Sequence, residues 1–401
     1  MALDWLWLAF ILVGHLGVMV VFVNVVHALG MSDERMSYVK IGALAVLVLG
    51  SLGFVYATTQ HVWTSWHVLP RVYAVVCLCV ALIGIPATSL LRFSRRLPLD
   101  ISERVEEVNF AEQHGKDNLI GEGKHAWILR IPGNESLRVC KREWEILLPS
   151  LPREWDGLSI LQLTDLHFAP CYDRRFFELI CEEAKKWESD LLLFTGDLID
   201  DDAVIDWIVP LMSTVEGKLG TYSILGNHDY DQDHRRVSIE LEKAGFTDLE
   251  GRWTELEIAG KTLGIGGTSY PWGPRLDLSE APNADFKLLL SHSPDFFYRA
   301  VKGGIDLMLS GHNHGGQIRL PFVGPVFMPS MYSRHFDRGF FRTGSTLLHV
   351  GQGIAAKHPI RIGCVPEIGR FVLRAVGPNP TQADAMPRVR LQESTDSVLT
   401  S

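Results

Sequence analysis

The stretch "IDLMLSGHNHGGQ" at residues 305–317 joins a short apolar run to two histidines, His312 and His314, and to three glycines. An apolar run of this length that ends in turn residues is typical of a β-strand buried on both faces. Glycine relaxes the steric limits on the backbone, so the chain can bend tightly after the strand. The stretch therefore predicts a buried strand that brings two imidazoles to one edge of a sheet.

Four other segments have the same form. Each is a short, nearly continuous apolar run that ends in Asp, Asn or His: "LSILQLTDLH" (158–167), "LLLFTGD" (191–197), "TYSILGNHD" (221–229) and "FKLLLSHSP" (286–294). Helical patterns lie between some of them, at 173–189, 204–215 and 235–245. Alternating strands and helices predict an α/β architecture with its chemistry at the carboxyl ends of the strands. Periodicity alone does not decide between one doubly wound sheet and two packed sheets.

The polar residues that end these strands form a candidate metal site. They are Asp165, His167, Asp197, Asn227, His228, His292, His312 and His314. Residues i and i+2 of an extended strand point to the same side, so Asp165 and His167 can direct two ligands at one point. The set is too large for one ion and about right for two. Mixed oxygen and nitrogen ligands without thiolates favour Mn²⁺, Fe or Zn²⁺ and argue against a structural zinc site.

Two neighbouring ions have a specific chemical use. A pair roughly 3.5 to 4 Å apart clamps a phosphoryl group, lowers the pKa of a bound water and stabilises both the entering and the leaving oxygen. One carboxylate must bridge two ions held so close together. Asp197, which stands alone after its strand in "TGD", is the candidate for that bridge. The residue set therefore predicts phosphoester hydrolysis.

Five short blocks carry a family resemblance. "DLH" at 165, "GDLID" at 196, "GNHD" at 226, "SHSP" at 291 and "GHNHGGQ" at 311 resemble, in order, the blocks of the calcineurin-like metallophosphoesterases. "LPSLPREWDGLSILQLTDLH" and "PIRIGCVPEIGRFVL" are similar to the bacterial membrane-associated branch that includes the YaeI and YkuE proteins. The resemblance covers roughly 138–375. It implies two packed mixed β-sheets flanked by helices.

The resemblance also implies a role for each site residue. One divalent ion would be held by Asp165, His167, Asp197 and His314. The other would be held by Asp197, Asn227, His292 and His312. His228 would protonate the leaving group or stabilise charge on the phosphoryl oxygens, with Asp229 orienting it. Mn²⁺ is the leading expectation for both ions and Fe or Zn²⁺ the alternatives, while Asn313 replaces a usual Thr without removing a ligand.

The excess of hydrophobic residues, which make up 47% of the 401-residue chain, lies almost entirely in the first hundred residues. Apolar segments at 5–29, 39–59 and 71–93 each reach the roughly 20 residues needed to cross a bilayer. The opening "MALDW" has no basic residue, and the first apolar segment is longer than the core of a cleaved signal peptide. We therefore expect three transmembrane helices within 1–96.

Positive charge beside these segments predicts their orientation. One basic residue, Arg71, flanks the second connection, and five flank the first connection or the end of the third segment: Arg35, Lys40, Arg92, Arg95 and Arg96. Lys and Arg collect on the cytoplasmic side of membrane proteins. We therefore expect a multi-pass protein of the cell membrane with its amino terminus outside and its catalytic domain in the cytoplasm. Six scattered cysteines without a paired framework agree with a reducing compartment.

The rest of the chain divides by composition. Residues 97–135 mix charge, glycine and short apolar runs and are interpreted as a linker with some strand content. Residues 136–376 form the metallophosphoesterase domain, which is long enough to bury a full core. Residues 377–401 are polar and contain prolines, so they are expected to be a disordered tail.

One apolar stretch, 321–341, has two interpretations. It is either a long loop packed on the sheet or, together with Trp253 and Trp272, an aromatic lip. In the second case, Arg334 and Arg338 could receive the phosphate of a lipid-borne substrate.

These features together predict a membrane-anchored, dinuclear-metal phosphoesterase. Its substrate would be a phosphorylated small molecule with a phosphodiester or pyrophosphate bond, and a lipid-linked one would explain the tether to the bilayer. No nucleic-acid partner is expected. The alternatives are a phosphomonoesterase, a nucleotide phosphodiesterase, or a catalytically silent membrane sensor or scaffold with the same fold. Loss of a ligand would favour the silent protein, and every ligand position is filled.

Overall fold

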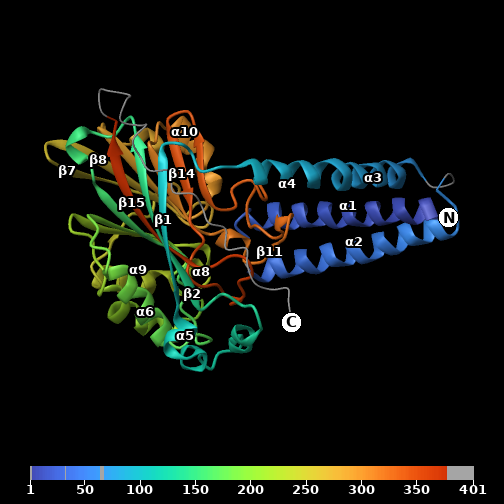
Figure 1. The fold of residues 1–401 in the computed structure, drawn as a ribbon, viewed down its shortest axis with the longest axis horizontal. Coiled ribbons are helices and arrows are strands. Elements are labelled where there is room, and N and C mark those ends of the chain that lie inside the picture. The colour runs from blue at the N-terminus through green and yellow to red at the C-terminus, as the bar shows by residue number, and fades with distance from the viewer. Residues whose placement is uncertain (1, 32, 64–66, 377–401) are drawn as a thin grey trace, which may run out of the picture.

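The structure, a computed structural model, describes residues 2–31, 33–63 and 67–376. A group of long N-terminal helices extends from one side of an α/β domain (Figure 1). The tail predicted at 377–401 lies outside the described residues.

The N-terminal region consists of α1 (Ala2–His27), α2 (Asp33–Thr59), α3 (Val68–Cys79) and α4 (Ile85–Ser94), with a π-helical turn joining the last two. Among the described residues, three helical segments are long and apolar enough to cross a membrane: Leu3–His27, Arg35–Thr59 and Val68–Ser94. They match the three predicted segments. In Figure 1, α1 runs toward the domain, α2 runs away from it, and α3 and α4 return to it. The first connection and the start of the domain therefore lie at the same end of the helices.

The first sheet of the domain has seven strands. Their order is β1 (Ile101–Asn109), β2 (Arg138–Leu148), β15 (Glu367–Ala375), β3 (Ser159–Leu163), β4 (Leu191–Thr195), β5 (Gly220–Ile224) and β6 (Thr247–Asp248). β3, β4 and β5 run parallel to one another, and β15 runs antiparallel to β3. The sheet is therefore mixed, and three of the predicted strands lie side by side in it.

The second sheet has six strands. Their order is β13 (Gly339–Thr343), β14 (Thr346–Val350), β10 (Leu307–Ser310), β9 (Phe286–Ser291), β8 (Lys261–Thr268) and β7 (Trp253–Ile258). β14, β10, β9 and β8 are parallel, and the two edge strands are antiparallel to their neighbours. The two remaining predicted strands are β9 and β10. A small hairpin, β11 (Arg319–Leu320) and β12 (Gly324–Pro325), follows β10.

The two sheets pack face to face around a shared apolar core. Ile160 and Leu193 of the first sheet lie in one buried cluster with Leu288 and Leu309 of the second. The outer faces are covered by helices, so these strands are buried on both sides and need no polar alternation. The helices are α5 (Phe110–His114), α6 (Arg174–Lys185), α7 (Ile208–Met212), α8 (Asn227–Tyr230), α9 (His234–Lys243) and α10 (Phe297–Lys302). Two packed mixed sheets are confirmed, and a single doubly wound sheet is not what forms.

Residues 97–135 belong to the folded domain, which corrects their description as a linker. β1 pairs with β2 along its whole length, and Phe110, Leu119 and Leu129 are almost fully buried in the core behind the first sheet. The segment has a loop-like composition because β1 is an edge strand with an exposed, charged middle. The start of the domain therefore lies near residue 101.

The stretch 321–341, called the docking segment below, packs against the N-terminal helices. Asn24 of α1 donates to the carbonyl oxygen of Val326 at 3.3 Å and to Ser333 Oγ at 3.2 Å. Its own side-chain oxygen accepts from the backbone N–H of Met328 at 3.0 Å. A buried amide in an apolar helix thus finds its partners in the domain.

A second contact of the docking segment is ionic. Asp337 has no exposed side-chain area and pairs with three arginines, Arg92, Arg95 and Arg319. Burial opposes ionisation of Asp337, but the arginines hold the pKa of this carboxyl below its usual range. Two of these arginines were used to predict the membrane orientation. In the structure, they also join the end of α4 to the domain.

Candidate metal centre

Every strand-end residue predicted as a ligand lies within four positions of the carboxyl end of a parallel strand. Asp165 and His167 follow β3, Asp197 follows β4, and Asn227 and His228 follow β5. Three more residues come from the second sheet, with His292 after β9 and His312 and His314 after β10. The site is therefore built at the edge where the ends of both sheets meet.

The side chains form two groups that share one carboxylate. The first group is Asp165, His167, Asp197 and His314, and the second is Asp197, His292 and His312. Within each group the ligand atoms lie within 4.8 Å of one another. Asn227 joins the second group, because its Oδ1 lies 3.0 Å from His292 Nε2. The structure thus brings all seven residues predicted as ligands together.

Asp197 has the surroundings of a bridging ligand. Its Oδ1 accepts from the backbone N–H of His228 at 2.9 Å. Its Oδ2 lies 3.5 Å from His167 Nε2 and 3.3 Å from His292 Nε2, yet it has no hydrogen-bond partner among the described residues. A fully buried carboxylate oxygen without a partner is rare in proteins. A divalent ion on each side would satisfy it, so the residues fit a two-metal centre.

The histidines differ in charge state. Burial lowers the pKa of His312 and of His314, and the neighbouring His292 and His167, respectively, lower them further. Neutral imidazole is the form that binds metals. At His292, the Asp197 carboxylate outweighs the effect of burial and raises the pKa to about 9. An ion beside Asp197 would replace that proton as the balancing positive charge.

His228 lies beside the two groups and is oriented by Asp200. Its Nδ1 is 2.7 Å from Asp200 Oδ1, and the same oxygen is 3.0 Å from His167 Nδ1. Burial opposes protonation of His228, but Asp197 and Asp200 raise its pKa to about 10. With 19% of its side chain exposed, His228 is more accessible than the fully buried His167. It is therefore the histidine best placed to meet a substrate.

Asp229, which was predicted to orient His228, accepts hydrogen bonds from backbone groups. One of its oxygens accepts from the backbone N–H groups of Leu198 and Ile199 at 2.8 and 3.0 Å. The other accepts from the backbone N–H of Gly226 at 2.8 Å. Asp229 thus joins the loop that carries Asp197 to the loop that carries the β5 ligands, while Asp200 orients His228.

Unusual backbone conformations aim the ligands. Five of them have a positive φ: Asp165 (52°), His167 (45°), Asp197 (59°), His312 (70°) and His314 (47°). Residues with a Cβ avoid this region, and such strain collects at functional sites. The loops are therefore not extended strands, so alternation is not the reason that i and i+2 ligands converge. Gly226 is needed nearby because a Cβ there would lie 2.1 Å from Asp197 Oδ1.

Sequence reasoning missed two residues that support the ligands. Asp200 stands in the quoted block "GDLID", but it follows a turn and not a strand end. Arg361 is 1% exposed and donates to the carbonyl oxygens of His314 and Gln352 at 2.9 and 2.6 Å. It comes 47 positions after His314, inside the quoted stretch "PIRIGCVPEIGRFVL", but nothing in that stretch indicated that it contacts a ligand residue.

The aromatic and asparagine residues singled out from the sequence are also placed. The ring of Trp272 lies 4.9 Å from that of His312, so it forms a wall of the second group. Trp253 lies elsewhere and donates to the carbonyl oxygen of Asp277. Asn313 donates to the carbonyl oxygen of Phe336 at 2.6 Å, away from the ligands.

A cavity of about 820 Å³ lies over this centre. The site residues in its lining are His167, Asp197, Asn227, His228, His312 and His314. The remaining lining comes from α1, α2, the docking segment and three loops of the domain. The metal centre and the N-terminal helices therefore share one cavity.

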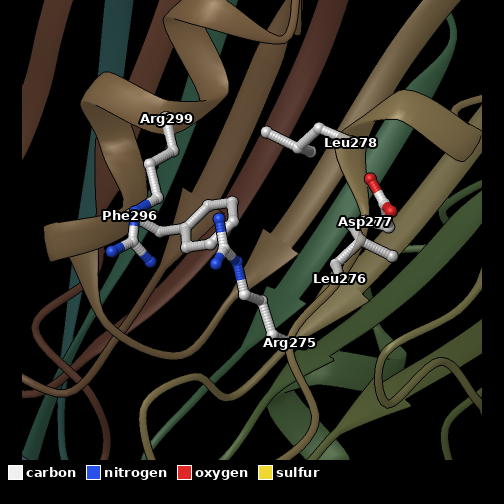
Figure 2. Close-up of a pocket in the computed structure, with 6 residues that line it drawn as sticks. All are labelled: Arg275, Leu276, Asp277, Leu278, Phe296 and Arg299. Carbon is white, nitrogen blue, oxygen red and sulfur yellow. The ribbon is translucent and has the colours of Figure 1, made fainter.

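Figure 2 shows a second cavity, of about 400 Å³, lined in part by Arg275 and Arg299. The Arg299 guanidinium lies 5.5 Å from the centre of the Phe296 ring. Among the described residues, this cavity has no lining residue in common with the larger one and contains none of the predicted ligands. The larger cavity is therefore the candidate substrate site.

Comparison with known proteins gives consistent matches. Residues 158–316 match a family described as "Calcineurin-like phosphoesterase". The chain is 30% identical to "Uncharacterized metallophosphoesterase YkuE" of Bacillus subtilis, across 56% of this chain and 82% of that protein. It is 26% identical to "Phosphodiesterase YaeI" of Escherichia coli, across 52% and 80%. A Bos taurus "Transmembrane protein with metallophosphoesterase domain" is also 26% identical, across 58% and 56%.

Proposed function

Because the chain belongs to the calcineurin-like metallophosphoesterase family, in the bacterial branch of YaeI and YkuE, we propose that it hydrolyses a phosphodiester or pyrophosphate bond at two divalent ions. The name of YaeI supports the choice of a phosphodiester. The observation that carries the proposal is the buried Asp197 Oδ2, which lies between two ligand groups without a hydrogen-bond partner among the described residues. A silent scaffold has no need to keep so poorly satisfied a carboxylate.

The residues divide the chemical work. One ion would be held by Asp165, His167, Asp197 and His314, and the other by Asp197, Asn227, His292 and His312. When bound, the two ions supply a water of lowered pKa and neutralise charge on the phosphoryl oxygens. His228 donates a proton to the leaving oxygen from Nε2, because Asp200 occupies its Nδ1. Mn²⁺ is the proposed metal, since oxygen and imidazole ligands without thiolate suit it.

The N-terminal helices are proposed to anchor the enzyme in the cell membrane with the catalytic domain in the cytoplasm. Three segments are long and apolar enough to span. The domain lies at the end of the helices that holds Lys40 and Arg92, on the side of the first connection (Figure 1). A reporter enzyme fused after residue 376 tests the sidedness. It should be active inside the cell, and activity only outside the cytoplasm would contradict the orientation.

A lipid-linked substrate is part of the proposal. The cavity over the metal centre is lined by side chains of α1 and α2, so a substrate in the site touches both the catalytic residues and the membrane helices. A molecule confined to the bilayer would reach this site without leaving the membrane surface.

The catalytic proposal is tested with the full chain purified in detergent and loaded with Mn²⁺. We expect hydrolysis of bis-p-nitrophenyl phosphate by the wild type and at least a 1,000-fold loss in Asp197→Ala, because one carboxylate serves both ions. Asp117→Ala is the matched control. The Asp117 side chain is 83% exposed, so this variant should retain full activity. p-Nitrophenyl phosphate, assayed in parallel, identifies a phosphomonoesterase. No hydrolysis by the wild type, or none lost in Asp197→Ala, would contradict the proposal.

A further inference from the structure

The cavity over the metal centre changes character along its length. At one end are the ligands and His228, and at the other is an apolar wall made by α1 and α2. Lys40, Lys124 and Lys357 also line this cavity and contribute positive charge from three separate parts of the chain. A site that combines candidate metal ligands, lysines and an apolar wall is complementary to an amphiphile with an anionic head.

α1 presents one continuous face to this cavity. The lining residues are Leu16, Met19, Val20, Val23, Asn24 and His27, which recur every three or four positions. At about 1.5 Å per residue, the face extends about 16 Å from His27, near the domain, to Leu16. Its polar residues lie beside the metal centre and its apolar residues lie deeper among the helices.

α2 repeats this gradient in the opposite chain direction. Its lining residues are Ser37, Lys40, Ala43, Leu44 and Leu47. Since α2 starts at the domain (Figure 1), its polar lining residues, Ser37 and Lys40, lie nearer the domain than its apolar ones. Leu44 is 59% exposed and Leu16 on the facing helix is 48% exposed, so the apolar part of the cavity is open at its edge. Both helices thus turn from polar to apolar with distance from the metal centre.

We propose that the membrane helices form part of the substrate site, with α1 and α2 binding the hydrocarbon chain of a phosphorylated lipid and the lysines binding its head group beside the ligands. This inference rests on the proposed function. It commits to one occupant, a lipid that enters from the bilayer. A water-soluble phosphoester would occupy the catalytic end and leave the apolar end of the cavity unused, whereas the hydrocarbon chain of a lipid would fill it.

Two probes with the same reacting group separate chain binding from chemistry. Dioleoyl phosphatidyl-p-nitrophenol has long chains, and its dibutanoyl analogue has short ones, while both release p-nitrophenol. The full chain is assayed in lipid nanodiscs with Mn²⁺. The quantity of interest is the ratio of kcat/KM for the long-chain probe to that for the short-chain probe.

Tryptophan substitutions then fill the apolar part of the cavity. Leu44→Trp and Val20→Trp should lower the ratio at least tenfold, because the indole occupies the space for the chain. Leu44 is already 59% exposed, so the larger ring there requires little repacking. The matched controls are Leu49→Trp and Val21→Trp. These two residues are 68% and 48% exposed, and neither lines the cavity. They should keep the ratio within about twofold of the wild type.

The outcomes separate the two proposals. If the wild type hydrolyses both probes and the cavity variants leave the ratio unchanged, the helices are only an anchor and the inference is overturned, while the proposed function stands. If the wild type hydrolyses neither probe, the proposed function fails and the inference fails with it. If the control variants lower the ratio as much as the cavity variants do, the effect comes from general disturbance of the helices, and the inference is also overturned.

Discussion

The two ends of the large cavity are built in different ways. At the metal end, every ligand follows a buried strand, and several are held in strained, fully buried conformations. At the membrane end, the wall is two helix faces that are joined to the domain chiefly by the docking segment. The difference teaches that the candidate ligands are placed by short local motifs, whereas the helix-lined end is placed by contacts between residues hundreds of positions apart.

The largest effect on hydrolysis is expected from the metal end. His314→Ala and His312→Ala each remove a ligand from a different group, so each should lower the bound metal from two ions per chain toward one at limiting metal. Hydrolysis of bis-p-nitrophenyl phosphate should fall at least 1,000-fold in both, because the reaction uses both ions. Metal content is measured by plasma mass spectrometry after gel filtration.

His234, which is partly buried and belongs to neither ligand group, provides the control for these substitutions. It lies at the start of α9, so His234→Ala should retain both ions and full hydrolysis. If His312→Ala and His314→Ala both kept two ions, the assignment of two ligand groups would be wrong.

A smaller loss is expected at Asp200, which contacts His167 and His228 but belongs to neither ligand group that shares Asp197. Asp200→Asn should lower kcat about 10- to 100-fold, the usual range for partners of metal-bound histidines. KM should change little, since the carboxylate lies behind the histidines. The pH profile of kcat should also shift, because Asp200 raises the pKa of His228.

Asp201→Asn is the matched control for Asp200→Asn. Asp201 is exposed, and its side chain accepts from the backbone N–H of Ala203, a contact that Asn preserves. It should have wild-type kcat and pH dependence. An unchanged pH profile in Asp200→Asn, with kcat reduced, would assign Asp200 to loop stability and not to His228.

The metal end could be predicted from the sequence because its signals are local. A buried strand requires a continuous apolar run, so the first polar residue after it, such as Asp197 or His292, stands out and lies at the sheet edge. The same rule missed Asp200, which comes after a further turn. It also gave the wrong reason for the convergence of Asp165 with His167, since positive φ angles and not strand alternation aim them.

The membrane end could be predicted only in outline. Apolar length indicated the helices, but nothing near Asn24 reveals that its partner is Met328, 304 positions away. Likewise, the linker description of 97–135 failed because a charged edge strand has the composition of a loop. Pairing between distant segments depends on the complete fold, and single-sequence periodicity does not contain it.

The membrane end should respond more weakly, and selectively, to loss of the ionic contact. Asp337→Ala leaves Arg92, Arg95 and Arg319 without their buried carboxylate, which should lower the free energy of unfolding by about 3 kcal/mol. The docking segment should loosen from α4. We expect a several-fold drop in hydrolysis of the dioleoyl probe relative to the dibutanoyl one, and faster proteolysis within 321–341.

Asp100 offers a surface pair for comparison. Its carboxylate pairs with Arg342, and the side chains are 34% and 27% exposed. Asp100→Ala should change the free energy of unfolding by less than about 1 kcal/mol, the usual limit for such pairs. Equal effects of Asp337→Ala and Asp100→Ala would show that the docking contact does not position the helices.

The smallest effect on hydrolysis is expected at Glu250, behind the metal end. Its oxygens accept from Leu225 N–H at 2.7 Å and Ser269 Oγ at 2.8 Å, and burial raises its pKa to about 7. Between the unfolded pKa of about 4.3 and this value, the folded state binds more protons, so stability falls as the pH rises. Glu250→Gln removes the titration; its amide oxygen can accept from Leu225 N–H, and its NH2 group would donate to Ser269 Oγ.

Melting of the metal-loaded protein at pH 5 and pH 8 checks this sign. The variant should gain several degrees over the wild type at pH 8 and little at pH 5, with hydrolysis of both probes within twofold. The exposed Glu255, changed to Gln, should show no such pH-dependent gain. A higher melting temperature at pH 8, with an unchanged ratio of kcat/KM for the long-chain and short-chain probes, would show that Glu250 affects the stability of the metal end and not the binding of the lipid chain. A greater gain at pH 5 than at pH 8 would contradict the raised pKa.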